Sequence, residues 1–250
     1  MFFNKDFRIG TRVGGSIRMK IGIIGAMDEE IYILKEKMQL EKELSFAGMH
    51  FCQGKLNNQQ IVVVRSGIGK VNAAICTQIL ISNFNVSAVI NTGVAGAIYD
   101  QLEVGDIVIS SDVIEHDVDV TGFGDYKLGQ IPRMDEYIFK ADKKLIHAAL
   151  EAGQTKDWEH KIVVGRILSG DVFVASTEKK SFLWNEFQGY CTEMEGAAIG
   201  HTCYVNDVPF LIIRSISDKA DNSAHVNFKE FIDKAVENSV QIVMGILERL

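Results

Sequence analysis

The fold is decided by one stretch of the sequence, Val208-Pro209-Phe210-Leu211-Ile212-Ile213-Arg214-Ser215-Ile216-Ser217-Asp218. Its run of branched and aromatic side chains, opened by a proline, predicts a buried central strand of an α/β sheet. Ligands of open α/β sheets bind beyond the carboxyl ends of the strands, which is where Asp218 would lie. A carboxyl group held there against an apolar sheet can have a raised pKa. Asp218 is therefore the leading candidate for a catalytic proton donor.

The composition predicts one globular domain. The chain has 250 residues, 47% of them hydrophobic and 24% charged, with only 2 prolines and no linker-like segment. A formal net charge of −7 without any long basic run argues against nucleic acid or an anionic membrane as partner. No apolar run approaches the ~18 residues that a membrane span needs. The four cysteines form neither a CxxC pair nor a metal-type spacing, which predicts reduced thiols in a cytoplasmic protein.

Residues 1–18 differ from the rest of the chain. They carry several basic residues and a Gly14-Gly15-Ser16 run, but they lack the apolar segment of a signal peptide. We expect an extension here, either a disordered arm, an alternative start or a cloning remnant, followed by the folded domain over residues 19–250.

Two glycine-rich segments follow two predicted strands. Ser66 to Lys70 comes after the second strand of a β-hairpin (46–53 and 60–65), and Thr92 to Gly96 comes after the strand 88–91. Small residues let a ligand approach the backbone closely. Together the two segments predict the floor of a cleft.

The first predicted strand, 20–26, leads through Met27-Asp28-Glu29-Glu30 into a helical pattern that ends near Met38. Its glycines do not form the GxGxxG pattern of dinucleotide-binding proteins, and three acidic residues stand where a pyrophosphate would need N–H donors. The acidic residues have two interpretations: they interact favourably with the dipole of a helix, or they belong to a functional site.

The remaining pattern alternates strands and helices. Strands are predicted at 104–109, 112–114 and 161–168, helices at 71–83, 139–151, 177–187, 196–204 and 227–250, and a long loop at 121–133. His116, Asp117 and Asp119 have no spacing that defines a metal site, so we expect none. If Glu193 and Glu195 lie in extended chain, they point to one side and could share a site; otherwise they are solvated acids at a strand end.

Three carboxylates, Glu30, Glu195 and Asp218, each follow a predicted strand. Cleavage of a glycosyl bond through an oxocarbenium-like state needs an acid for the leaving group, a base for water and acceptors for sugar hydroxyls. A flat apolar wall would orient a base by stacking. The residues alone therefore predict a small-molecule enzyme that uses carboxylates.

Seven motifs in order carry a family resemblance: Gly22-Ile23-Ile24-Gly25-Ala26-Met27-Asp28-Glu29-Glu30, Ser66-Gly67-Ile68-Gly69-Lys70, Asn91-Thr92-Gly93-Val94-Ala95-Gly96, Val104-Gly105-Asp106-Ile107-Val108, Ser169-Gly170-Asp171, Glu193-Met194-Glu195 and Ser217-Asp218. From about residue 19 to its end, the chain resembles the 5′-methylthioadenosine/S-adenosylhomocysteine nucleosidases of the nucleoside phosphorylase superfamily. The resemblance implies a single-domain, three-layer α/β fold, with a central twisted mixed β-sheet flanked by helices.

The resemblance also implies an activity: cofactor-free hydrolysis of both nucleosides to adenine plus methylthioribose or S-ribosylhomocysteine, in methionine salvage and the activated methyl cycle. It further implies a homodimer, and the family pocket could admit 5′-deoxyadenosine or aminofutalosine. By position, Asp218 would protonate adenine N7 with help from Ser217, Glu30 would act on the attacking water, and Glu195 would bind ribose hydroxyls. The other implied substrate-binding residues are Met27, Ile68, Gly96, Phe173, Val174, Glu193, Met194 and Phe228, with Val120, Phe123 and Pro132 contributed by a dimer partner.

Two departures from the family pattern concern specificity. Val94 stands where many members carry serine, and the loop around Asp125 to Lys127 holds one extra residue. Two other functions remain open. A phosphorylase would need arginines near the first loop, where Asp28, Glu29 and Glu30 would repel phosphate. A nucleoside sensor without turnover would be expected to have lost the acid or the base.

Overall fold

The computed structural model describes residues 19–154 and 158–250, apart from the side chains of residues 225, 226 and 229. The extension predicted over residues 1–18 lies outside the described residues. Within the described part of the chain, no helix combines the length and the apolar character needed to cross a membrane.

Four parallel strands form the centre of the molecule. They are β1 (Lys20–Gly25), β4 (Gln59–Arg65), β5 (Ala88–Ala97) and β10 (Phe210–Asp218), and they lie in the order β4-β1-β5-β10. Every residue of β5 and β10 is buried, as expected for parallel strands covered on both faces. Because the strands are parallel, their carboxyl ends meet at one edge. The predicted central strand is confirmed as β10, but it begins at Phe210 and continues through Arg214 to Asp218, where we expected it to end before Arg214.

Part of the sheet closes on itself. Strand β10 pairs antiparallel with β6 (Ile107–Glu115), and β6 pairs parallel with β8 (Ile162–Ser169). Strand β9 (Cys191–Glu193) then joins β8 to β5. The predicted mixed sheet is confirmed, and these five strands surround a common interior rather than leaving an open edge.

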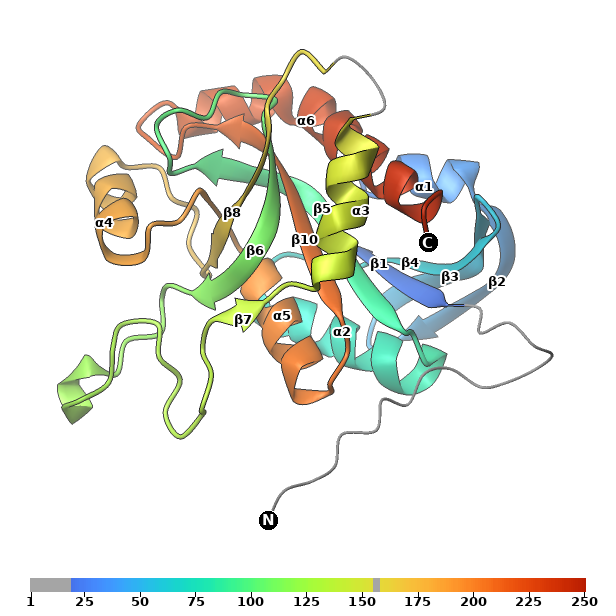
Figure 1. Cartoon of the computed structure of the whole chain (residues 1–250), viewed down its shortest axis with the longest axis horizontal. Helices are drawn as coiled ribbons and strands as arrows, with labels where there is room; N and C mark the ends of the chain where they lie inside the picture. Colours follow the sequence, from blue (N-terminus) through green and yellow to red (C-terminus); the bar gives the residue numbers. More distant parts are fainter. Residues whose placement is uncertain (1–18, 155–157) are drawn as a thin grey trace.

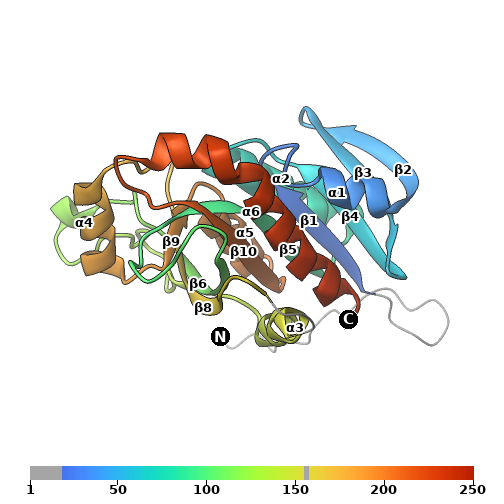
Figure 2. The same cartoon turned by 90° about the horizontal axis from the view of Figure 1, so that it is seen from above.

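Helices cover both faces of the sheet and complete the predicted three layers. On one face α6 (Ala224–Leu247) packs along β10 and β5, with α1 (Tyr32–Lys37) and α3 (Lys143–Gly153) beside it. On the other face α2 (Lys70–Phe84) packs against α5 (Gly196–Val205). Figure 1 and Figure 2 show this arrangement, with α4 (Thr177–Phe187) standing apart at one end of the molecule.

The predicted hairpin is confirmed, and it belongs to a longer antiparallel unit. Strand β3 (Met49–Leu56) turns into β4 through Asn57 and Asn58, both of which have positive φ angles, as a two-residue type I′ hairpin requires. The edge strand β2 (Gln39–Phe46) was not predicted. None of its residues is fully buried, and Lys42 interrupts the alternation that Leu40, Leu44 and Phe46 make with polar neighbours, so its strand pattern is weak.

Several predicted boundaries are wrong. The segment Thr92 to Gly96 belongs to β5 because its small residues pair with β10, and it is not a loop. The strands expected at 104–109 and 112–114 are one strand, β6, with a register shift between Ser110 and Val113. The helix expected from residue 139 begins at Lys143 because Asp142 caps it, and Phe139–Lys140 form the short strand β7.

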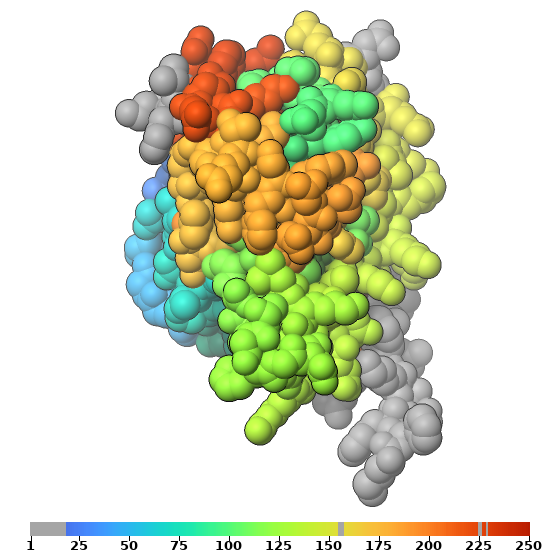
Figure 3. Space-filling model, turned by 90° about the vertical axis from the view of Figure 1, so that its left-hand side faces the viewer, coloured from blue at the N-terminus to red at the C-terminus, as the bar shows by residue number. Residues whose placement is uncertain are grey.

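The long loop predicted at 121–133 lies within the connection between β6 and β7. Its only regular structure among the described residues is one 3-10 turn, Thr121–Phe123. The connection projects from the body of the molecule, at the lower left of Figure 1 and below α4 in Figure 3.

Candidate active site

A buried arginine lies at the centre of a group of carboxylates. Arg214 is fully enclosed in β10. Its Nη2 donates to Asn91 Oδ1 at 2.5 Å and to Glu193 Oε2, and its Nη1 donates to the Ile213 carbonyl at 3.1 Å. The same Nη2 lies 3.7 Å from Glu195 Oε2. Burial lowers the pKa of Arg214, but Glu193, Glu30 and Glu195 outweigh this effect and keep the guanidinium charged.

Glu30 is buried at the carboxyl end of β1. Its Oε2 accepts the backbone N–H groups of Ala26 at 2.6 Å and Met27 at 3.0 Å, and its Oε1 accepts the N–H of Val94 at 3.2 Å. Burial raises its pKa, while Arg214 and these three donors oppose the rise. The helix-dipole interpretation is therefore wrong for Glu30, because α1 begins only at Tyr32 and the side chain points into the protein.

Glycine is required where this carboxylate meets β5. A Cβ atom at Gly93 would lie 2.3 Å from Glu30 Oε1 and 3.2 Å from Arg214 Nη1. Any larger residue would displace the Glu30 carboxylate and the guanidinium, which gives this glycine of the Asn91–Gly96 motif a packing reason.

Glu193 and Glu195 occupy different environments beside Arg214. Glu193 ends β9 and contacts Ser169 Oγ, Arg214 and the backbone N–H groups of Glu195 and Gly196. Glu195 accepts a hydrogen bond at its Oε1 from the Gly69 N–H, at 2.8 Å. Burial, reinforced by the charge of Glu193, raises the pKa of Glu195 to about 8. The two acids thus share one buried site and are not solvated.

Asp218 ends β10 next to the same cluster. Ser217 Oγ donates to its Oδ2 at 2.9 Å, and the Ala220 N–H donates to its Oδ1 at 2.8 Å. Asp218 lies opposite Gly96 in the strand register, and a Cβ at Gly96 would come within 2.8 Å of Oδ1. Glu30 accepts a hydrogen bond from Val94, two residues before Gly96 on β5. The predicted acid and the predicted base therefore contact the same strand, β5, at positions two residues apart.

Apolar side chains accompany the polar cluster. Phe173, 42% exposed, meets Phe228 edge to face with ring centroids 6.1 Å apart. Ile68 is 53% exposed and Met27 is partly buried, so both have surface available to a ligand, whereas Val174 is buried. Met194 is partly buried between the two acids of its motif.

Val120, Phe123 and Pro132 lie on the projecting connection after β6, and Phe123 is 83% exposed. His116, Asp117 and Asp119, the residues considered for a metal site, lie at the start of this connection. Asp117 forms an ion pair with Lys70 at 2.7 Å and not with His116 or Asp119. Among residues 19–154 and 158–250, no three His, Cys, Asp or Glu side chains are grouped so that they could hold a metal ion.

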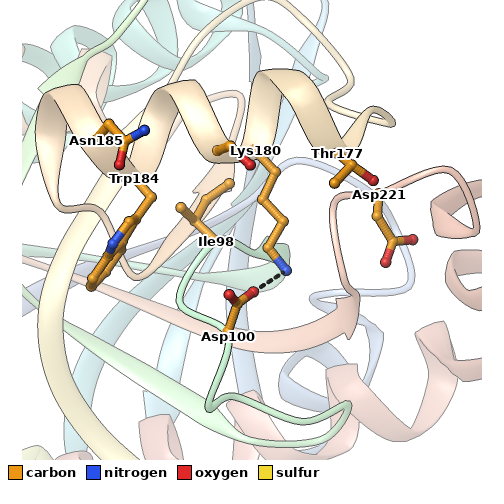
Figure 4. Close-up of a pocket in the computed structure, with 8 residues that line it drawn as sticks. Ile98, Asp100, Thr177, Lys180, Trp184, Asn185 and Asp221 are labelled. Atoms are coloured by element: carbon orange, nitrogen blue, oxygen red, sulfur yellow. Dashed lines mark ion pairs between the residues drawn. The ribbon is translucent and has the colours of Figure 1, made fainter.

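A cavity of about 390 Å³ opens elsewhere, between α4 and the start of the β5–β6 connection. Its lining includes Asp100, Lys180 and Asp221, and Figure 4 shows Lys180 pointing to Asp100. Glu30, Glu195 and Asp218 do not line this cavity, so it is distinct from the carboxylate cluster.

Sequence reasoning assigned no role to Arg214 or Asn91. The sequence does carry a signal for Arg214, because an arginine in a mostly apolar buried strand needs buried anions as partners. The identity of those partners was not visible, because Asn91 lies 123 residues away along the chain.

Comparisons with known proteins show the family of the chain. A model described as the phosphorylase superfamily matches residues 20–248. A 5′-methylthioadenosine/S-adenosylhomocysteine nucleosidase from Staphylococcus haemolyticus is 45% identical over 231 residues, which cover 92% of this chain and 100% of that protein.

Solved structures show the same relation. The nucleosidase of that name from Neisseria meningitidis, in complex with methylthio-immucillin-A, has a TM-score of 0.89 and 42% identity, covering 92% of this chain and 99% of the other. Futalosine hydrolase of Helicobacter pylori has a TM-score of 0.88 and 35% identity, covering 93% and 99%. The chain belongs to the 5′-methylthioadenosine/S-adenosylhomocysteine nucleosidase family of the phosphorylase superfamily.

Proposed function

We propose that this protein hydrolyses the N-glycosidic bond of 5′-methylthioadenosine and S-adenosylhomocysteine, releasing adenine and methylthioribose or S-ribosylhomocysteine. The observation that carries the proposal is the group of buried carboxyl side chains, Glu30, Glu195 and Asp218, at one end of the central strands. Such a group supplies an acid, a base and a hydroxyl acceptor for one reaction. The names of the relatives support the same substrates.

In this mechanism Asp218 donates a proton to adenine N7 as the bond between N9 and C1′ breaks. Ser217, which donates to Asp218 Oδ2, orients the carboxyl group. Glu30 takes a proton from water, and the resulting hydroxyl bonds to C1′ of the oxocarbenium-like sugar. The raised pKa of Glu30 suits this step, because a general base works best with a pKa near the working pH.

The rest of the site holds the nucleoside. Glu195, beside the Met194 backbone, accepts ribose hydroxyls, and the Gly69 N–H donates to its Oε1. Glu193 holds Arg214 and the Glu195 N–H instead. Phe173 stacks on adenine, the Val174 backbone reads the edge of the base, and Gly96 leaves room for it. Met27, Ile68 and Phe228 surround the ribose and the 5′ substituent.

The first experiment measures adenine release from methylthioadenosine with phosphate rigorously absent and then added. Release without phosphate, together with free methylthioribose, is the expected result. Strict dependence on phosphate would make the protein a phosphorylase and remove the role of Glu30. Binding of adenine nucleosides without release in either condition would support a sensor.

The 5′ substituent is the open part of the specificity. One similar structure is a futalosine hydrolase, so aminofutalosine is a candidate substrate besides 5′-deoxyadenosine. Parallel kcat/KM measurements on these nucleosides and methylthioadenosine rank them. The lost serine hydroxyl at Val94 and the longer loop around Tyr126 are the positions where this chain's ranking can differ.

The protein acts as a homodimer in this proposal. A groove of about 770 Å³ runs over α2 and α5, and its lining includes Val71 (70% exposed), Ile75 and Val205 (58% exposed). Contiguous exposed apolar surface of this kind is typical of an interface. The projecting connection, with Val120, Phe123 and Pro132, would reach the partner's 5′ pocket from the same side, since Val118 and Ile131 also line the groove.

Phe123→Asp tests the dimer. We expect little change in the free energy of unfolding, because the side chain is 83% exposed in one chain, but a rise of about tenfold in KM for methylthioadenosine through loss of an interface contact. Light scattering reports the mass. A monomeric wild type, or an unchanged KM, would contradict the proposal.

The proposed location is the cytoplasm. All four cysteines are buried free thiols, which is the state that a reducing compartment maintains.

A further inference from the structure

A closed set of polar contacts around Lys70 fastens the segment after β4 to the segment after β8. Lys70 Nζ donates to Asp117 Oδ1 at 2.7 Å and to Glu115 Oε2 at 2.9 Å. The Lys70 backbone N–H donates to Asp171 Oδ1 at 2.8 Å, and the Asp171 N–H donates to Asp117 Oδ2 at 2.9 Å. We call these four residues the Lys70 network.

The Lys70 network is charged and mostly sheltered. The Lys70 side chain is only 17% exposed, and His201 of α5 adds a second contact to Glu115 at 3.2 Å. Burial raises the pKa values of Glu115 and Asp117. Hydrogen bonds from His201 and Lys70 to Glu115, and from Lys70 to Asp117, outweigh burial, so both pKa values are below the ordinary ones. Both carboxylates therefore stay ionised and hold the ammonium group in place.

The residue before Lys70, Gly69, contacts Glu195 of the candidate active site. The Gly69 N–H donates to Glu195 Oε1, so residues 69 and 70 contact Glu195 and Asp171 through consecutive N–H groups. Gly69 has a φ of 98°, and a Cβ there would lie 3.1 Å from Asp171 Oδ1. Asp171 stands two residues before Phe173. The anchored segment thus lies between the carboxylate assigned to ribose and the aromatic ring assigned to adenine.

We propose that Lys70 is a positioning residue for the nucleosidase reaction. Through Asp117, Asp171 and the Gly69 N–H, it holds Glu195 and Phe173 at the separation that the ribose and the adenine of one nucleoside require. This inference rests on the roles proposed above for Glu195 and Phe173. Lys70 itself acts on neither the leaving group nor the water, since its ammonium group is engaged by two carboxylates.

The test compares Lys70→Met with Lys70→Arg and a matched control, Arg166→Met. Arg166 forms a half-buried ion pair with Asp112 at 2.5 Å, away from the carboxylate cluster. For Lys70→Met we expect KM for methylthioadenosine to rise about tenfold while kcat changes less than about threefold. The binding groups, Glu195 and Phe173, would be misplaced, whereas Asp218 and Glu30 would be unchanged. Lys70→Arg should recover most of the loss, and Arg166→Met should leave KM unchanged.

Two further readouts make the outcome unambiguous. The dissociation constant of methylthio-immucillin-A, measured by titration calorimetry, should weaken with KM in Lys70→Met, and light scattering should show an unchanged mass. An unchanged KM and dissociation constant in Lys70→Met, or an equal rise in Arg166→Met, would overturn the positioning role while leaving the proposed function intact. If wild-type protein released no adenine, the proposed function would fail, and the calorimetric comparison would still decide the role of Lys70.

Discussion

Two groups of carboxylates in this protein are built from the same residue types but have opposite electrostatic states. In the central cluster one guanidinium, Arg214, faces Glu30, Glu193 and Glu195 in a fully buried setting, and the pKa values of Glu30 and Glu195 are raised. In the Lys70 network Glu115 and Asp117 share Lys70, His201 also contacts Glu115, and the pKa values of both carboxylates are lowered.

The difference teaches that burial and contact with cationic side chains set the pKa of each acid. The central cluster places three carboxylates around one guanidinium in a buried setting, and burial raises the pKa values of Glu30 and Glu195, the latter to about 8. In the Lys70 network, hydrogen bonds from Lys70 and His201 outweigh the effect of burial and lower the pKa values of Glu115 and Asp117, so these two carboxylates stay ionised and serve as fixed anchors. Residue type alone would not separate the two groups.

The largest expected effect tests whether Asp218, beside the central cluster, is the proton donor. Asp218→Asn should lower kcat by about 10²–10⁴-fold, because the amide cannot protonate adenine. The same replacement in the network, Asp117→Asn, should lower kcat less than about tenfold. Single-turnover adenine release measures both, with circular dichroism to check folding. Near-normal turnover by Asp218→Asn would remove its assignment as the acid.

The second effect concerns the stability of the central cluster. The folded-state pKa of Glu195 is raised, chiefly by burial, to about 8. Between the ordinary carboxyl range and that value the folded state binds more protons than the unfolded state, so stability falls as the pH rises. Relative to wild type, Glu195→Gln should therefore gain about 1–3 kcal/mol of unfolding free energy between pH 5 and pH 8.

Urea denaturation at several pH values measures this gain. Because neighbouring acids titrate together, the midpoint belongs to the cluster and not to Glu195 alone. A difference between variant and wild type that does not change with pH would show that Glu195 has an ordinary pKa.

The smallest effect has the opposite sign. Burial raises the pKa of Asp117, but hydrogen bonds from Lys70 and the Asp171 N–H outweigh burial and bring the pKa below its ordinary value. The ionised form of Asp117 therefore stabilises the fold. That contribution is present at neutral pH and disappears as the pH falls through the folded-state pKa, below the ordinary value of 3.8. Asp117→Asn should cost about 1 kcal/mol at pH 7 and nothing at low pH.

Asp28→Asn is the matched control for this measurement. Asp28 forms an exposed ion pair with Arg65 at 3.5 Å, so its replacement should leave the unfolding free energy unchanged at either pH. An equal loss in both variants would mean that the Lys70 network is an ordinary surface feature.

Much of the fold and part of the site were predictable from local pattern. The apolar run 210–216 predicts its strand, and Asn57-Asn58 predicts a tight hairpin, because each depends on neighbours along the chain. Strand β2 was missed because Lys42 interrupts its alternating pattern, and its pairing with β3 makes it a strand. Glu30 had two interpretations until its burial removed one.

The sequence by itself determined the family and the α/β class, and it predicted three carboxylates for the site, since apolar runs and ordered motifs are properties of the chain. Only the tertiary structure decided how each acid behaves. Its contacts join residues far apart in sequence, such as Gly69 with Glu195, 126 positions away, and Lys70 with Asp171, 101 positions away. A pKa depends on burial and on charges within a few ångströms, and these exist only once the chain has folded.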